Sequence, residues 1–394
     1  MPWRQTQVSE ERMKFVAACK EEKWSMAELC RAFGISRKTG YKYLGRFNAM
    51  KLDGLKDQSR AAHHHPNETP QEVVETIVAA RRGHPTWGPR KLLAWLERQG
   101  HGAELPSAST AGDILKRHGL VVPRKRRRTS TPSTQPLVAA THPNAVWCAD
   151  YKGWFRTQDG QRCDPLTITD GFSRFLLMCR AVEVPNHVHT RRQFEYAFRE
   201  YGLPGAIRTD NGSPFASTAL GGLSLLSVWW VKLGIRIEHI EPGKPEQNGR
   251  HERMHGTLKI ATAYPPRQNA RAQQRTFDAF RSEFNFERPH EALGNETPAE
   301  HYQHSTREYP IKVPAVDYPG HFEVRSVHTD GRIKWRGSMV YVSEVLIGER
   351  IGLERVSETQ LKLYFGPVTL GALDETSMSI LAYRRLTWSS HRAS

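Results

Sequence analysis

The sequence predicts a multidomain α+β protein: two helical units, then an α/β core with a mixed sheet, then a small antiparallel β barrel. Three observations predict this order. Helical periodicity with capping residues dominates residues 1–119, and strand-like and helix-like segments alternate across 144–305. Apolar and polar residues alternate with a period of two over 318–374. A chain of 394 residues is long enough for several separate cores.

The basic charge of the chain is concentrated in its first third. The chain carries 57 Lys and Arg against 41 Asp and Glu, a formal net charge of +16. Residues 1–128 contain 25 of the basic residues and 13 of the acidic ones. This asymmetry predicts a polyanion-binding region joined to a nearly neutral one. Nucleic acid is the leading candidate for the polyanion, and an acidic membrane surface is the alternative.

Composition excludes several classes of protein. The 10 Trp, 12 Tyr and 15 Phe exclude a chain that is disordered throughout. The longest weakly polar run, residues 220–231, is too short for a membrane span, and the first residues lack the apolar core of a secretion signal. Five cysteines without a C-x-x-C pair indicate neither a disulfide framework nor a zinc ribbon. We therefore expect a protein of a reducing cytoplasm.

Residues 1–50 show the pattern of a helix-turn-helix domain. Ser25 and Glu28 form a capping box for the second of three short helices, Gly34 ends that helix, and Ser36 caps the third. The third helix is rich in Arg, Lys and Tyr, as expected of a helix that reads DNA. The side chains predicted to face DNA are Arg37, Lys38, Tyr41, Lys42 and Arg46. The alternative is a small helical bundle with a solvated charged face.

A second helix-turn-helix-like DNA-binding domain is predicted over residues 69–122. Thr69 is expected to cap its first helix, WGPRKLLAWLERQG (87–100) to form its second, and Ser107 to begin its third. Arg90 and Lys91 are its predicted DNA contacts.

Two linkers are predicted around this domain. Residues 51–68 contain His63, His64 and His65, which cannot share one face of a regular element, so a solvated loop is expected instead of a metal site. Residues 123–143 form a basic linker suited to lying along a phosphate backbone. Its predicted DNA contacts are Arg124, Lys125, Arg126, Arg127 and Arg128.

The α/β core is expected over residues 144–305. Strands are predicted at 146–155, 164–170, 175–183, 205–210 and 235–240. Helices are predicted at 187–201, 223–233 and 252–263. In the C-terminal barrel over 318–374, Asp330-Gly331 is the predicted turn of a β-hairpin.

Asp150, Asp210 and Glu252 are the candidate catalytic residues. Asp150 lies inside an apolar strand, Asp210 ends a short strand, and Glu252 stands near the start of a helix, so the three can meet at one rim of the sheet. Singly, each can also be a capping or salt-bridged carboxylate. Three converging carboxylates repel one another by roughly 4 kcal/mol per pair near 4 Å at an effective dielectric of 20. Mg²⁺, which prefers carboxylates together with phosphate oxygens, would remove that cost.

The motifs around these residues resemble those of the DDE transposase and retroviral integrase superfamily. The matching segments are WCADYKG around Asp150, TDNGSPF around Asp210, GKPEQNGRHERMHGTLK around Glu252, and FNFERPHEALGNETPAEHY at 284–302. The resemblance covers residues 140–302 and implies an RNase H-like fold, two Mg²⁺ ions per active site with Mn²⁺ as a substitute, and DNA strand transfer. The helical units resemble the domains with which such transposases find the ends of their element.

The third carboxylate has two candidates. Counting residues from Asp210 as in retroviral integrases leads to Glu246, whereas the motif P-x-x-x-G-x-x-E leads to Glu252. We favour Glu252, because a helix holds a carboxylate more firmly than a Pro/Gly loop does. Lys259, two turns further along the same face, is expected to meet a DNA phosphate, unless it is simply solvated. The chain departs from retroviral integrases in lacking a His/Cys zinc domain, and it has no P-loop motif for ATP.

Together these features predict a bacterial transposase that binds the terminal inverted repeats of an insertion sequence and cuts and joins DNA. Its expected partners are double-stranded DNA at the element ends and the target, and further copies of itself, as a dimer or larger assembly. We expect it in the cytoplasm with the nucleoid, without membrane or ATP. The alternatives are a stand-alone Mg²⁺-dependent nuclease of the same fold and a DNA-binding regulator with an inactive core.

Overall fold

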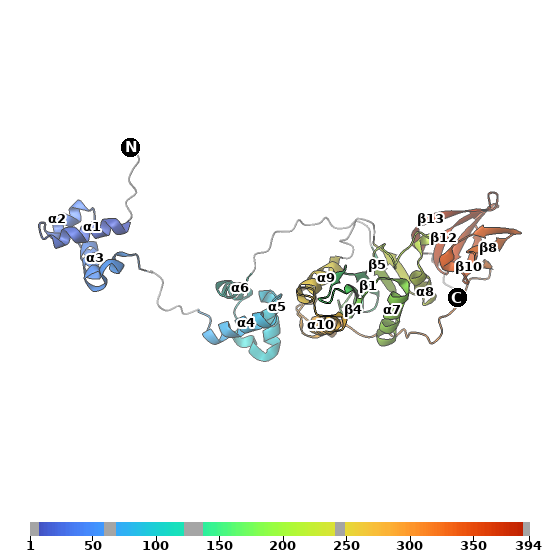
Figure 1. Ribbon diagram of the computed structural model, residues 1–394, viewed down its shortest axis with the longest axis horizontal. Helices are drawn as coiled ribbons and strands as arrows, with labels where there is room; N and C mark the ends of the chain where they lie inside the picture. Colours follow the sequence, from blue (N-terminus) through green and yellow to red (C-terminus); the bar gives the residue numbers. More distant parts are fainter. Residues whose placement is uncertain (1–7, 59–67, 122–136, 241–248, 389–394) are drawn as a thin grey trace, which may run out of the picture. The chain divides into compact units, whose positions relative to one another are not determined.

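The computed structural model describes residues 8–58, 68–121, 137–240 and 249–388. The chain divides into two compact units, Met1–Glu68 and Thr69–Ser394 (Figure 1). The histidines at 63–65 lie outside the described residues.

The first unit is a three-helix domain. Its helices are α1 (Val8–Lys20), α2 (Met26–Ala32) and α3 (Arg37–Met50), followed by a 3-10 turn (Lys51–Leu55). The capping box of Ser25 and Glu28 at the start of α2 is confirmed. A Cβ at Gly40 would lie 2.6 Å from the Cys30 Sγ, so α3 can cross α2 this closely only at a glycine. Leu55, placed in the linker by the sequence, is buried in this domain's core.

A second three-helix domain opens the second unit. It consists of α4 (Gln71–Gly83), α5 (Pro89–Leu96) and α6 (Ala108–Arg117) around a core that includes Trp87 and Leu92. Ser107 caps α6 as predicted. The predicted cap at Thr69 is wrong, because Pro70 occupies the N-cap position and no side chain caps α4. A π-helical turn (Glu97–His101) follows α5 and ends the helical segment, with Gly100 at a φ of 93°.

The core of the second unit is a mixed sheet. Its strands are β1 (Val146–Tyr151), β2 (Phe155–Arg156), β3 (Arg162–Asp170), β4 (Leu176–Val182), β5 (Ala206–Thr209) and β6 (Arg236–His239). Strand β3 pairs antiparallel with β1, β2 and β4, whereas β1, β5 and β6 run parallel. The single strand predicted at 146–155 is divided at Gly153, whose φ of 88° turns the chain.

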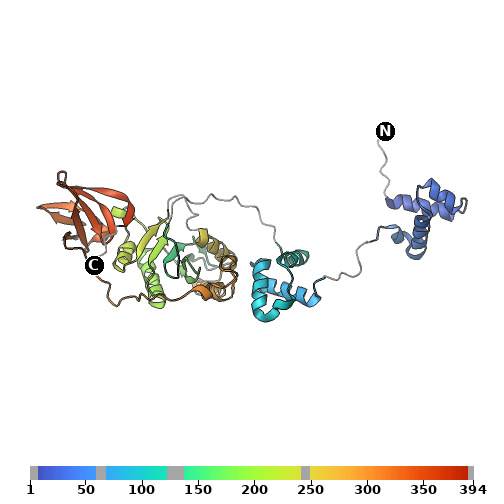
Figure 2. The ribbon, with the colours of Figure 1, turned by 180° about the vertical axis from the view of Figure 1, so that it is seen from behind.

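Different helices cover the two faces of this sheet (Figures 1 and 2). These helices are α7 (His187–Tyr201), α8 (Leu225–Lys232), α9 (Gly249–Thr262) and α10 (Ala270–Ser282). Trp147 and Ala149 of β1 share a core with α7 and α8, whereas Cys163, Leu176 and Cys179 pack against α9 and α10. The sequence did not predict α10 or the short α11 (Pro298–His301) that follows it. The sheet is therefore the middle of three layers.

The C-terminal domain is an open antiparallel sheet with a separate hairpin. Its strands are β7 (Glu323–Ser326), β8 (Arg332–Trp335), β9 (Ser338–Tyr341), β10 (Arg350–Arg355), β11 (Gln360–Phe365), β12 (Val368–Asp374) and β13 (Ser379–Trp388). The five-stranded sheet has the order β13-β12-β11-β10-β7, and β8 pairs with β9. The predicted barrel is not confirmed, because the edge strands β13 and β7 do not pair with each other in the described chain.

The predicted hairpin turn at Asp330-Gly331 is wrong. Strand β7 pairs with β10 instead of β8, and the hairpin β8–β9 turns at Arg336-Gly337. Both turn residues have positive φ, 45° and 85°, as a two-residue hairpin turn of type I′ requires. Asp-Gly is the more common sequence in two-residue hairpin turns, but here the hairpin turn is the Arg-Gly pair that follows it in the chain.

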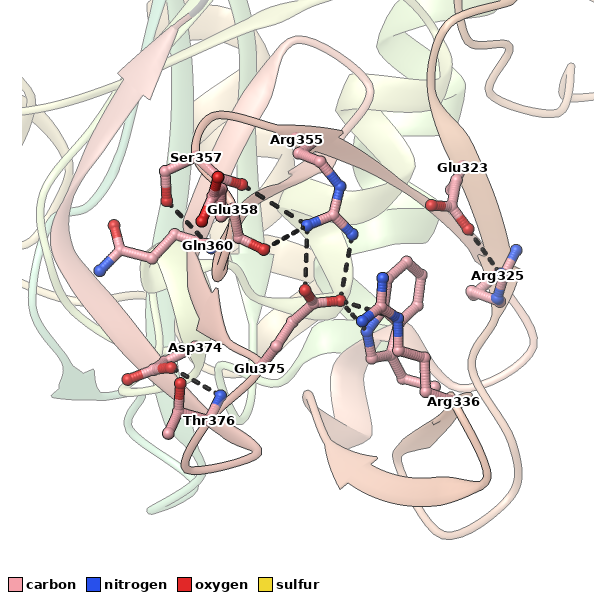
Figure 3. A network of polar contacts seen from close by, with 11 residues as sticks. Glu323, Arg325, Arg336, Arg355, Ser357, Glu358, Gln360, Asp374, Glu375 and Thr376 are labelled. Atoms are coloured by element: carbon pink, nitrogen blue, oxygen red, sulfur yellow. Dashed lines mark hydrogen bonds and ion pairs between the residues drawn. The ribbon is translucent and has the colours of Figure 1, made fainter.

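Glu375 ties the hairpin to the five-stranded sheet (Figure 3). Its carboxylate accepts hydrogen bonds from Trp335 Nε1 at 2.9 Å and from both terminal nitrogens of Arg355 at 2.9 and 3.1 Å, and lies 3.1 Å from Arg336 Nε. Its side chain is only 7% exposed. One carboxylate thus joins the β8 end of the β8–β9 turn to β10.

We predict that Glu375→Gln lowers the Tm of the protein at neutral pH, whereas Glu358→Gln, at an exposed glutamate of the neighbouring turn, does not. Hydrogen bonds from Arg355 and Trp335 and the charge of Arg336 lower the pKa of Glu375 to about 2. An unfolded glutamate has a pKa of about 4.3, so the stabilisation is complete above that pH and is lost as the pH falls through about 2. Thermal unfolding between about pH 7 and about pH 2 measures the difference from wild type, and a difference independent of pH would contradict the prediction.

Candidate active site

The parallel pairing of β1 with β5 places Asp150 beside Asp210. Cys148 pairs with Arg208 in the register of these two strands. Asp150 comes two residues after Cys148, and Asp210 comes two residues after Arg208. Because side chains alternate along a strand, the two aspartates occupy equivalent positions on the same face. Strand β5 ends at Thr209, and Asp210 is therefore the first residue of the turn at the carboxyl end of the sheet.

Short contacts hold the turn that carries Asp210. The Gly212 N–H donates to Asp210 Oδ1 at 3.1 Å, and Asn211 Nδ2 donates to the Ile240 carbonyl at 2.6 Å. A Cβ at Gly212 would lie 3.0 Å from Asp210 Oδ2, so a larger residue would press on the carboxylate. The Asp-Asn-Gly sequence thus forms a turn that closes on its own aspartate.

Glu252 completes the group of carboxylates. It is an exposed residue in the first turn of α9. We preferred it to Glu246 because it was expected to lie on a helix, and it does. Glu246 itself lies outside the described residues. Burial raises the pKa of Asp150 to about 7, and the negative charges of Asp210 and then Glu252 add to this rise. Asp210 and Glu252 therefore lie close enough to the half-buried Asp150 for their charges to act on its carboxyl group.

Two histidines of α9 that the sequence analysis did not single out fasten this helix to the sheet. His251 and His255 are buried and lie one turn apart on the same face. Thr167 Oγ1 is within 2.6 Å of His255 Nε2 and 2.8 Å of His251 Nε2, and Thr169 Oγ1 lies 2.8 Å from His251 Nδ1. Burial lowers the pKa of His251 to about 3 and that of His255 to about 2, so both rings are neutral. In the sequence, the feature that could have indicated these two histidines is their H-x-x-x-H spacing, which encloses Glu252.

The same histidines approach Asp150. His255 Nδ1 lies 3.7 Å from Asp150 Oδ2, and one donor atom from each of Asp150, His251 and His255 lies within 4.8 Å of the others. Both nitrogens of His251 already have threonine partners, so this trio acts chiefly as a support for the carboxylate. The three carboxylates are the better match for Mg²⁺, which prefers oxygen ligands.

The predicted DNA contacts are found in several places. Arg37, Lys38, Tyr41 and Lys42 are exposed on α3, and Arg46 is half-buried beside the Tyr43 ring. Lys259 is exposed on α9, with its Nζ 5.5 Å from the centre of the Tyr264 ring.

In the second helical domain, Arg90 is exposed and lies 3.8 Å from Glu291, whereas Lys91 lines a cavity. The five basic residues at 124–128 lie outside the described residues. In the part of the chain that the structure describes, none of the helices has the length and apolar character needed to cross a membrane.

Solved structures similar to this chain are retroviral integrases. The catalytic core domain of HTLV-2 integrase in complex with magnesium is 17% identical, with a TM-score of 0.33, covering 41% of this chain and 99% of that one. The simian T-cell lymphotropic virus intasome in complex with the PP2A regulatory subunit B56 gamma is 16% identical, with a TM-score of 0.36, covering 81% and 100%.

Proteins similar in sequence come from bacterial insertion elements. An uncharacterized 31.7 kDa protein of insertion element IS407 from Burkholderia multivorans is 28% identical over 64% of this chain and 88% of its own length. An uncharacterized 39.2 kDa protein of IS476 from Xanthomonas euvesicatoria is 29% identical over 68% and 75%.

Known domain families match two regions of the chain, one helical and one in the α/β core. Integrase core domain families match residues 140–245 and 233–298. A helix-turn-helix domain family matches residues 11–63, and a homeodomain-like family matches 39–115. The matches to the core include the positions of Asp150, Asp210 and Glu252. The chain therefore carries helix-turn-helix domains ahead of an integrase core domain, and its sequence is similar to proteins of bacterial insertion elements.

Proposed function

We propose that this chain is an insertion-element transposase that binds the terminal inverted repeats of its element, cuts the DNA there and joins the freed 3′ ends to target DNA. The observation that carries the proposal is the grouping of Asp210 and Glu252 around Asp150 within an integrase core. The similarity to insertion-element proteins and the helix-turn-helix domains support it.

The carboxylates fit a site for Mg²⁺, with Mn²⁺ as a substitute. Burial raises the pKa of Asp150 most, the charges of Asp210 and Glu252 raise it further, and the charge of Lys152 only partly opposes them, so a divalent cation would stabilise the ionised carboxylates. Asp150, Asp210 and Glu252 would hold two ions, and the central strand β1 would keep Asp150 in place. When bound, the ions supply Lewis acidity and stabilise charge on the attacking and leaving oxygens of an in-line phosphoryl displacement.

The protein's own groups position the reaction. Strand β1 fixes Asp150, the closed turn fixes Asp210, and the threonine–histidine contacts fix α9 and hence Glu252. No general base is required of the protein. The exposed face of α3 would bind the terminal repeats, the basic linker and Lys259 would contact phosphates, and two or more copies would assemble on the DNA because two ends are processed together. The reaction would need no ATP and would take place at the bacterial nucleoid.

We expect Glu252→Gln to abolish both nicking and joining of a DNA that carries the element's own flanking sequence. Even a change to an outer partner of a metal ligand costs about 10–100-fold, so a lost ligand should leave less than about one hundredth of the rate. Glu246→Gln is the matched control and should retain both steps. Loss of activity in Glu246→Gln alone would move the third carboxylate to that residue. Nicking without joining in the unaltered protein would identify a nuclease, and DNA binding without either step would identify a regulator.

We expect Asp210→Asn to have opposite effects on stability with and without Mg²⁺. In EDTA it should raise the Tm, because it removes a charge that repels Asp150; about 1 kcal/mol corresponds to a rise of ~2–4 °C for a domain of this size. In Mg²⁺ it should lose the increase in Tm that the wild type shows. Because the folded pKa of Asp150 is raised to about 7, the metal-free wild type should lose stability as the pH rises from about 4 to about 7. A Tm of the wild type that Mg²⁺ does not change would contradict the metal site.

A further inference from the structure

An acidic segment follows helix α10, and its charge is opposite to that of the second helical domain. This acidic segment, residues 283–300, contains five glutamates and one arginine, a net charge of −4. Residues 81–98, which include α5, contain five Arg and Lys and one glutamate, a net charge of +4. Surfaces of opposite charge favour association with each other.

Ion pairs join the acidic segment to α5 and to the turn that follows it. Arg98, in the π-helical turn after α5, donates to Glu300 Oε2 at 3.1 Å and to the Asn295 carbonyl at 3.0 Å. Arg90, in the first turn of α5, lies 3.8 Å from Glu291. Arg90, which the sequence predicts to contact DNA, thus stands beside a carboxylate of its own chain.

The residues before α5 add contacts to the same segment. His84 Nδ1 lies 3.6 Å from Glu283 Oε1, and Arg288 Nη1 lies 3.5 Å from Thr86 Oγ1. The Arg288 guanidinium also lies 6.0 Å from the centre of the Trp87 ring, at the limit for a cation–π interaction. Contacts therefore exist both before and after α5, and together they fix the orientation of the helix on the segment.

The acidic segment is held on the core by contacts of its own. The Asn285 side chain exchanges hydrogen bonds with the backbone of Leu176 in β4, at 2.7 and 3.0 Å. Thr297 and Glu300 form the capping box of α11. These contacts do not involve the helical domain, so the segment and its glutamates stay with the core whether or not that domain is docked.

The contact between the helical domain and the core is polar and exposed. Among the described residues, the apolar cluster with Trp87 and Leu92 contains residues of the helical domain alone, and the clusters around the mixed sheet contain none of them. The Arg98 and Glu300 side chains are 33% and 50% exposed. Exposed ion pairs stabilise weakly and are screened by salt, and polar contacts between domains of one chain permit relative motion. Docking of the helical domain is therefore reversible.

We propose that the acidic segment competes with DNA for the basic surface of the second helical domain, so that the free protein holds this domain on its core and DNA displaces the segment. The inference rests on the proposed function and adds a regulation of its DNA binding. Glu291 and Glu300 offer carboxylate oxygens where DNA would offer phosphate oxygens, because arginine binds both groups with the same donors. The apparent affinity for DNA is then reduced by the fraction of molecules in which the domain is docked.

Glu300→Gln and Arg98→Gln in the full-length protein test this, because they break the same ion pair and change the net charge in opposite directions. Glutamine also serves as a capping-box partner, so Glu300→Gln keeps the cap of α11. The probe is a fluorescent duplex that carries the element's flanking sequence, and its affinity is measured by anisotropy at about 0.1 M salt. Both variants should bind it about two- to fivefold more tightly than the wild type, the range expected for the loss of an exposed ion pair that opposes binding.

Glu287→Gln is the matched control. Glu287 is exposed in the same acidic segment and takes part in neither of the ion pairs that Arg90 and Arg98 form. This variant should keep the affinity of the wild type. If net charge alone governs the affinity, Glu287→Gln and Glu300→Gln will tighten binding equally and Arg98→Gln will weaken it, and the proposed competition is overturned.

The outcomes distinguish this inference from the proposed function. If the wild type nicks and joins DNA but Arg98→Gln binds the duplex no more tightly, the competition fails and the transposase proposal stands. If both variants bind more tightly but the wild type neither nicks nor joins, the competition stands and the proposed strand transfer fails. If the wild type does not bind the duplex, both proposals fail.

Discussion

The register between β1 and β5 is the constraint on which the candidate active site depends. Two parallel strands offset by one residue would direct Asp150 and Asp210 to opposite faces, because side chains alternate along a strand. The register is held by large apolar side chains on the other face, where Trp147 and Ile207 are fully buried against α7 and α8. The packing of one face of the sheet therefore sets the positions of the carboxylates on the other.

Helix α9 carries the third carboxylate, and polar contacts determine its position. Thr167 stands opposite Asp150 on β3, and its hydroxyl meets both His251 and His255. A buried threonine–histidine network is directional, whereas apolar contacts between α9 and the sheet would tolerate sliding. Glu252, exposed on this helix, can therefore be held near the aspartates without being buried itself.

Two regions of the second unit contain titratable groups with strongly shifted pKa values. Burial and the charges of Asp210 and Glu252 raise the pKa of Asp150, while burial and neighbouring basic groups lower the pKa values of Lys91 and His290. Proteins retain such costs mainly where a ligand relieves them. Under the function proposed above, divalent cations would relieve the first.

The sequence by itself determined the domain order and the capping of α2 and α6, because helix caps and period-two patterns are local signals. Its short motifs also predict the three carboxylates as a site. It did not determine the open C-terminal sheet or the hairpin turn at Arg336-Gly337. It also did not show that Leu55, expected in a linker, is buried in the core of the first domain. Nor did it reveal His251 and His255 as anchors, or the crowding of Lys91 with Arg174 and Arg288. These depend on which distant segments come together, and strand pairing and charge crowding are properties of that packing.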